Sequence, residues 1–174
     1  MADLELVQDF VNTADLEQRR DDFRDARGLV RWLAGHRLAG PRLNAREADA
    51  SDARAVREAL RELLRANNGI DVDEAAAAAT LDAASRRAGL RVRFDKGAIR
   101  LVPAGGGVQE ALGAVLAAAA EAMADGSWQR LKACRADDCR WAFVDHARNH
   151  SRQWCDMRVC GNRQKARAFR ARHA

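Results

Sequence analysis

The chain has 174 residues and a net charge of +5; 48% of its residues are hydrophobic but only 5% are aromatic, and alanine supplies much of the apolar share. This composition favours close-packed helices over a thick β-sandwich, and the length allows one core with, at most, a small additional module. No apolar run approaches the ~18 residues of a membrane span, and the acidic N-terminus does not resemble a signal peptide, so we expect a cytoplasmic protein with no membrane partner.

The N-terminal part of the chain predicts two amphipathic helices. Apolar residues recur at helical spacing over residues 4–14 and again over residues 25–38. Residues 17–25 between them are nearly all charged or polar, which predicts an exposed loop or a frayed turn. Neither helix is long, so both must bury their apolar stripes against other elements.

A longer helix is expected next. Asn44 is a suitable N-cap, and the apolar spacing continues through Ala66. Arg57 and Arg61 alternate with glutamates on the side that we predict to face water. Asn67-Asn68-Gly69 is typical of a left-handed helix end.

The middle of the chain predicts a helix, a β-hairpin and another helix. An alanine-rich helix covers about residues 73–88, and strands at 90–94 and 98–102 flank a turn at Asp95-Lys96-Gly97. A second alanine-rich helix covers residues 108–124. We therefore expect a mainly α protein of the α+β class, with a helical domain over residues 1–126 and a second domain over residues 127–174.

All four cysteines lie in the last quarter, as two C-x4-C pairs separated by fifteen residues: Cys134, Cys139, Cys155 and Cys160. In a reducing cytosol, paired cysteines are more often metal ligands than disulfides. Four thiolates suit the tetrahedral preference of zinc, and a closed site of four cysteines leaves no open position for catalysis. We predict one structural Zn²⁺ per chain. Two disulfides, four buried thiols, or a mixed site using His146 or His150 are the alternatives.

The spacing of the pairs predicts a treble-clef-like zinc finger. Residues 131–133 and 141–144 suit two strands around the first pair, and Asn149 or Ser151 could cap a helix that carries the second pair near its start. The four histidines have no nucleophile or carboxylate arranged around them, and no phosphate-binding glycine loop is present. We therefore expect a protein that is not an enzyme.

The C-terminal tail is strongly basic. Residues 130–174 contain twelve Lys and Arg against four Asp, whereas the rest of the chain is net negative. This asymmetry is typical of a protein that touches a polyanion with one end. On a helix, Arg163, Arg167 and Arg170 form one stripe, and we expect Phe169 to anchor that helix on the hairpin. The residues predicted to contact DNA are Arg152, Arg158, Asn162, Arg163, Lys165, Arg167, Arg170 and Arg172. Charge balance around a tetrathiolate zinc (Lys132, Arg135, Arg158, Arg163), or simple solvation, is the competing interpretation.

The last ligand and the three residues after it, Cys160-Gly161-Asn162-Arg163, resemble the CGNR zinc-finger family. In that family the finger follows an α-rich domain called ABATE, described as a stress-induced bacterial transcription regulator. Residues 10–13 (Phe-Val-Asn-Thr) and 29–33 (Leu-Val-Arg-Trp-Leu) are similar to that domain. The resemblance implies that the four cysteines bind zinc and that the finger binds DNA.

Other partners are also considered. A polar cluster in the N-terminal domain could line a pocket for a small-molecule effector, through Phe10, Asn12, Thr13, Asp15 and Trp32. A homodimer would suit a regulator. A finger that only docks a protein or ligand, or an RNA-binding protein that stacks bases on Trp141 and Trp154, remains an alternative to DNA binding.

Overall fold

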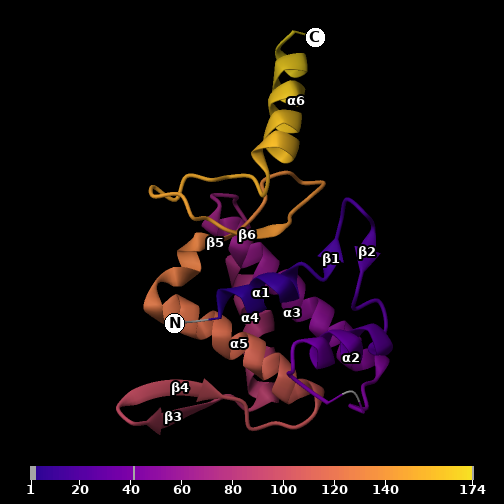
Figure 1. Cartoon of the computed structure of the whole chain (residues 1–174), viewed down its shortest axis with the longest axis vertical. Coiled ribbons are helices and arrows are strands. Elements are labelled where there is room, and N and C mark those ends of the chain that lie inside the picture. The colour runs from indigo at the N-terminus through magenta and orange to yellow at the C-terminus, as the bar shows by residue number, and fades with distance from the viewer. Residues whose placement is uncertain (1–2, 41, 174) are drawn as a thin grey trace.

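The computed structural model describes residues 3–40 and 42–173, so residues 1–2 and 174, at the outer ends of the two predicted domains, lie outside the described part. It confirms a mainly helical fold with small two-stranded antiparallel sheets (Figure 1). The last helix, α6, projects from one end of a helical body, and the β3–β4 hairpin lies at the other end.

The six α-helices of the described residues are α1 (Leu4–Val11), α2 (Ala26–Gly35), α3 (Glu47–Asn67), α4 (Glu74–Ala88), α5 (Val108–Asp125) and α6 (Asn162–Arg172). Three antiparallel pairs join β1 (Ala14–Asp15) to β2 (Arg20–Asp21), β3 (Arg91–Asp95) to β4 (Ala98–Val102), and β5 (Leu131–Ala133) to β6 (Ala142–Val144). A 3-10 turn, η1 (Ser127–Arg130), precedes β5, and a π-helical turn, η2 (Met157–Gly161), precedes α6.

Helices α3 and α5 form the centre of the body, and their small side chains allow close packing. Ten residues of α5 are buried, and six of these are Ala or Gly. A Cβ on Gly113 would lie 2.7 Å from the Pro103 Cβ and 2.9 Å from the Ala88 Cβ. Distances below 3.0 Å leave no room for a methyl group at Gly113. The glycine therefore allows the backbone of α5 to lie close to α4 and to the residue that follows β4.

The predicted exposed loop at residues 17–25 is partly wrong. Residues 14–21 form the short β1–β2 hairpin, and Phe23 is fully buried. Its ring packs at 5.3 Å from Phe10 and 5.6 Å from Trp32, between centroids. A single aromatic in a charged stretch carries no periodicity, so the sequence pattern could not place it in the core.

Helix α3 begins two residues later than predicted. Arg46, not Asn44, occupies the N-cap, and the Asp49 carboxylate accepts a hydrogen bond from the Arg46 backbone N–H at 2.7 Å. An acidic side chain in the first turn therefore satisfies the exposed backbone donor that Asn44 was expected to serve.

Two arginines that were predicted to face water are buried. Arg57 is 4% exposed and Arg61 is 2% exposed. The Arg57 guanidinium binds both Asp21 oxygens, at 2.6 and 2.9 Å. Arg61 donates to the backbone carbonyl oxygens of Val11 and Ala14, at 2.5 and 3.3 Å. Burial lowers the pKa of Arg61, and these contacts tie α3 to the end of α1.

The β5–β6 hairpin packs into the body rather than beside it. Leu131, Ala133 and Ala142 belong to the same buried cluster as the helices, while Phe143 belongs to a second cluster with the cysteines. The predicted boundary after Gly126 therefore falls between two segments that share a core. In the part of the chain described, no helix is both long and apolar enough to cross a membrane.

Replacing Arg61 with Ala should lower the free energy of unfolding by about 3 kcal/mol, because two buried carbonyls lose their donor. The matched control is Arg65→Ala, one turn along the same helix, where the main partner is the half-exposed Glu62 at 2.8 Å. That change should cost less than about 1 kcal/mol. Urea unfolding of the zinc-loaded proteins measures both, and equal losses would contradict a structural role for the buried arginine.

Candidate metal centre and basic helix

The four cysteine sulfur atoms come together at one point. All lie within 4.8 Å of one another, with Cys139–Cys155 and Cys155–Cys160 separations of 3.6 and 3.7 Å. A tetrahedron with Zn–S bonds of about 2.3 Å has edges of about 3.8 Å, whereas a disulfide requires about 2.05 Å. The donor set and its spacing therefore fit a tetrathiolate zinc site. Among the residues described, no histidine joins this group.

The surrounding elements present the two pairs from opposite sides. Cys134 follows β5 and Cys139 precedes β6, as predicted, so the first pair lies in the loop of the hairpin. Cys155 precedes η2, and Cys160 lies within it. The predicted caps are wrong: Asp156 accepts from the Arg158 backbone N–H at 2.6 Å and so caps this turn. The Ser151 hydroxyl donates to the Asn149 side chain at 2.8 Å, away from this turn.

The thiols share protons among themselves. Hydrogen bonds from Cys139 and Cys155 lower the pKa of Cys134 to about 2. Bonding to Cys134 in turn raises the pKa of Cys155 to about 12, and it raises that of Cys139. The cluster therefore already favours one thiolate, and a divalent cation would displace the remaining protons.

Aromatic side chains surround the cluster. Trp141, Trp154 and Phe143 pack against the cysteines. Gly161 lies against two of the neighbouring side chains: a Cβ there would lie 2.3 Å from the Met157 sulfur and 3.1 Å from Trp154. The absence of a side chain at this position lets the finger close.

A single asparagine joins the end of α1 to the finger. The Asn12 amide donates to the Ala142 carbonyl at 3.0 Å and its oxygen accepts from the Ala142 N–H at 2.8 Å. This pairing imitates a neighbouring strand, so Asn12 satisfies the open edge of β6. The two residues are 130 positions apart in the chain, and sequence reasoning missed the contact.

The end of α3 supplies a second attachment point. Asn67 donates to the Leu131 carbonyl at 2.9 Å. Asn68 donates to the carbonyls of Ala133 and Gln153, at 2.7 and 2.9 Å. The segment that was predicted only as a helix end therefore also fixes β5 and the chain entering the second cysteine pair.

A buried ion pair orders the long loop after β6. The Lys132 ammonium lies 2.8 Å from the Asp145 carboxylate and also donates to the His150 carbonyl. Burial alone would raise the pKa of Asp145, but bonds from Lys132 and from the N–H groups of Ala147 and Arg152 outweigh it, and the pKa is lowered. The pair therefore stabilises the fold at neutral pH, and its contribution is lost as pH falls below about 4.

Helix α6 has no buried residue and stands clear of the body (Figure 1). The prediction that Phe169 anchors the helix is wrong: this residue is 56% exposed and stacks on His173, the C-cap of the same helix, with ring centroids 4.2 Å apart. The helix is held at its first turns instead. Arg163 bonds to Glu17 at 2.9 Å and to the Cys160 sulfur at 3.4 Å, and Arg167 bonds to Asp138 at 2.8 Å.

The predicted DNA contacts fall into two groups. Arg163 and Arg167 are held in these ion pairs, and Arg152 donates to the Trp154 and Cys155 carbonyls while lying 4.9 Å over the Phe143 ring. The others are exposed and have no ion pair within the described residues: Arg158, Asn162, Lys165, Arg170 and Arg172. Of the four residues considered for charge balance, Arg163 contacts a ligand sulfur, whereas Lys132 and Arg135 bond to oxygen atoms.

The residues expected to line an effector pocket make contacts within the fold. Phe10 is fully buried, with its ring centroid 5.4 Å from that of Trp32, and Asn12 and Thr13 are 8% and 1% exposed. The Thr13 hydroxyl donates to the Phe10 carbonyl at 2.8 Å, and Asp15 accepts from the Gln18 N–H at 2.9 Å. These side chains form core and turn contacts, and an effector pocket lined by them stays a prediction.

Comparison with protein families gives two matches along the chain. The ABATE model, described as "Putative stress-induced transcription regulator", matches residues 4–126. The CGNR zinc finger model matches residues 130–173. A search of curated proteins found no match.

Removing the metal should unfold the outer part of the finger while leaving the hairpin in place. Zinc contributes about 10–16 kcal/mol in small zinc modules, and α6 has no buried residue to replace it. β5 and β6 should persist because their apolar side chains lie in the core of the body. Hydrogen exchange with and without a chelator should show lost protection in residues 155–172 only. Simultaneous loss in α3 would contradict this.

Breaking the buried ion pair should destabilise the finger strongly. Asp145→Asn leaves a buried Lys132 ammonium without its countercharge, which should cost about 3–5 kcal/mol. Asp138→Asn is the matched control, because that carboxylate is partly exposed and pairs with Arg167 on the surface; its cost should stay below about 1 kcal/mol. Urea unfolding of the zinc-loaded variants measures the difference, and similar costs would refute the role of the pair.

Proposed function

This chain belongs to the ABATE family and ends in a CGNR zinc finger, and from this premise we propose that it regulates transcription by binding DNA through α6. One structural Zn²⁺, held by Cys134, Cys139, Cys155 and Cys160, would close the finger and supply no open coordination position. The proposed role is therefore one of binding, without catalysis.

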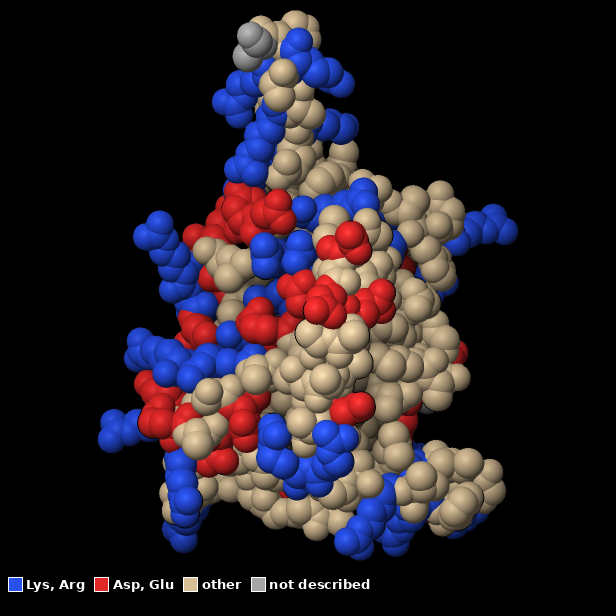
Figure 2. Space-filling model, turned by 180° about the vertical axis from the view of Figure 1, so that it is seen from behind, with Lys and Arg blue, Asp and Glu red and all other residues tan. Residues whose placement is uncertain are grey.

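The observation that supports DNA binding best is the exposed basic helix. Helix α6 carries five basic residues and no acidic one, and Figure 2 shows Lys and Arg side chains spread around the projecting helix. An α-helix of this kind fits the major groove, and unpaired Lys and Arg side chains supply the phosphate contacts that dominate affinity. Lys165, Arg170 and Arg172 are the members that no acidic side chain within the described residues neutralises.

The other basic residues of the finger have supporting roles in this proposal. Arg163 and Arg167 orient α6 through Glu17 and Asp138, and Arg152 closes the loop before Cys155. These ion pairs fix the direction of α6 without burying any of its residues. Because they are exposed to solvent, they weaken as the salt concentration rises. Exposed Arg158 and Asn162, at the base of α6, lie where they can add a phosphate or base-edge contact.

The two tryptophans considered for stacking on unpaired bases do not favour binding to single-stranded RNA. Recognition of unpaired bases requires exposed aromatic faces, and Trp141 and Trp154 are the aromatic residues that the sequence offered for it. Both pack against the cysteine cluster and are only partly exposed. A finger that only docks a protein would not need three unpaired cations on a helix that has no buried residue and is held only at its first turns.

The sharpest test removes the unpaired charges. Lys165→Ala, Arg170→Ala and Arg172→Ala together should weaken binding to duplex DNA at every sequence. If all three contact phosphates, the slope of log K against log salt should fall in magnitude by about 2 to 3. Fluorescence anisotropy of the zinc-loaded protein over a salt series measures both quantities.

The matched control removes the same charge from the helical body. Arg27, Arg31 and Arg37 are exposed on α2 and just after it, and their replacement by Ala should leave the slope unchanged. Equal effects of the two triple variants would show that net charge, and not α6, drives binding. No binding by the native protein at low salt would refute the proposal and favour a docking module.

A further inference from the structure

The loop that follows β6, residues 145–152, has a fixed backbone although it belongs to no helix or strand. The buried Asp145 carboxylate accepts a hydrogen bond from the Arg152 N–H at 3.0 Å, so it joins the two ends of the loop. The Lys132 ammonium pairs with this carboxylate and donates to the carbonyls of His150 and Arg152. One buried ion pair therefore holds the backbone of the loop in place.

The outer side of this loop is polar and basic. Its exposed side chains are those of His146, Arg148, Asn149 and His150. Residues 146–154 contain no acidic residue. The acidic residues that border this range are both engaged, Asp145 in the buried ion pair and Asp156 as the cap of η2. Within the described residues, the Arg148 side chain takes part in no ion pair, so its charge is available to a ligand.

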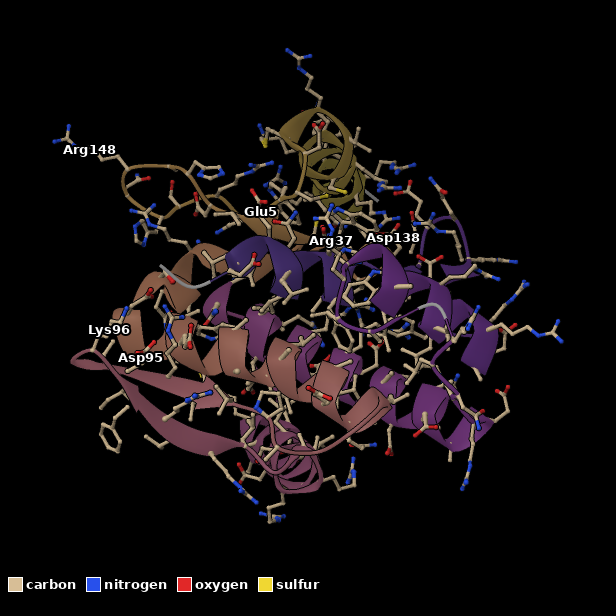
Figure 3. The ribbon with its side chains drawn as sticks, turned by 60° about the horizontal axis from the view of Figure 1, so that its bottom comes forward. Glu5, Arg37, Asp95, Lys96, Asp138 and Arg148 are labelled. Carbon is tan, nitrogen blue, oxygen red and sulfur yellow. The ribbon has the colours of Figure 1, made fainter. Side chains whose placement is uncertain are left out.

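The loop and α6 lie at the same end of the molecule. Figure 1 shows the loop reaching to one side of the finger, at the base from which α6 projects. In Figure 3, Arg148 lies at the outer end of the loop and its side chain points away from the body. The cysteine cluster connects the two elements, because the loop ends shortly before Cys155 and α6 begins shortly after Cys160. Helix and loop are therefore two neighbouring basic projections.

Given the proposed binding of DNA through α6, on which this inference rests, we propose that Arg148 binds a phosphate of the DNA backbone beside the groove that α6 occupies. In protein–DNA complexes, contacts to phosphates from elements next to the recognition helix fix the orientation of the protein and carry no sequence information directly. A guanidinium group binds phosphate through several N–H donors at once. The Asn149 amide and the two histidines of the same turn supply further donors to the backbone.

Two features favour a phosphate over a protein partner or a loop that is only solvated. Residues 146–151 read His-Ala-Arg-Asn-His-Ser and offer no large apolar side chain, whereas the centre of a protein interface is enriched in aromatic residues. A loop that only connects β6 to Cys155 does not need a buried ion pair, which costs the desolvation of two charges. A loop whose backbone is already fixed loses little conformational freedom when it binds.

The first experiment measures binding of the zinc-loaded full chain to duplex DNA by fluorescence anisotropy over a salt series. Arg148→Ala should reduce the magnitude of the slope of log K against log salt by about 0.9, and weaken binding about eightfold at 0.1 M salt. Arg148→Lys should keep the slope, because a phosphate contact needs the charge and not the planar fork. Arg37→Ala removes an exposed arginine of the helical body and should also keep it. Zinc content and circular dichroism should be native in all three.

Each departure from these results contradicts the proposal. An unchanged slope in Arg148→Ala, in a protein whose binding depends on α6, overturns the loop contact and leaves the function of α6 standing. A slope lost equally in Arg148→Lys would show that the arginine reads a base edge instead of a phosphate. No binding by the native protein at low salt refutes the DNA-binding function and the loop contact together.

A combined variant tests whether the loop and α6 contact separate phosphates. It carries Arg148→Ala together with Lys165→Ala, Arg170→Ala and Arg172→Ala. If the contacts are separate, the reductions in slope should add, to about 3 to 4 in total. A combined slope equal to that of the triple variant of α6 would show that Arg148 contacts no phosphate of its own, and would overturn the proposal.

Discussion

The β5–β6 hairpin is the constraint on which the rest of the molecule depends, because its two faces serve different cores. Leu131, Ala133 and Ala142 lie in the core of the helical body, while Phe143 contacts the cysteine cluster. The alternation of a β-strand makes this possible with six residues. The metal site is thereby built directly onto the body, and the fold of the body fixes where the finger lies.

This arrangement explains how a segment with few large apolar residues keeps a defined position. Asn12 and Asn68 satisfy backbone groups of the hairpin, and Lys132 with Asp145 orders the loop that returns the chain to Cys155. Only then do the four sulfur atoms meet at tetrahedral spacing. Helix α6 follows directly from the last cysteine, so its direction depends on the metal and on the ion pairs of Arg163 and Arg167. A helix held only at its base leaves its remaining length available for a ligand.

In the helical body, two charged residues of α3 also serve as structural contacts. Arg57 and Arg61 lie on α3 with the spacing of a solvated face, yet both are buried and bind groups contributed by the β1–β2 region and the end of α1. The small side chains of α4 and α5 leave few large apolar groups with which to bury the N-terminal connections. Buried guanidinium groups, each with several donors, satisfy the carbonyls there instead.

The sequence by itself determined what depends on local spacing: the helices, the β3–β4 hairpin, the cysteine pairs with their flanking strands, and the basic composition of the tail. Periodicity, turn residues and ligand spacing act within a few residues, so they can be recognised without the fold. Only the tertiary structure decided which residues meet across the chain. It paired Arg163 with Glu17, 146 positions apart, it joined Asn12 to Ala142, and it buried Phe23 while leaving Phe169 exposed. Such contacts depend on how the elements pack. The sequence around a polar residue or an isolated aromatic residue has no local pattern that indicates which distant residue it will contact.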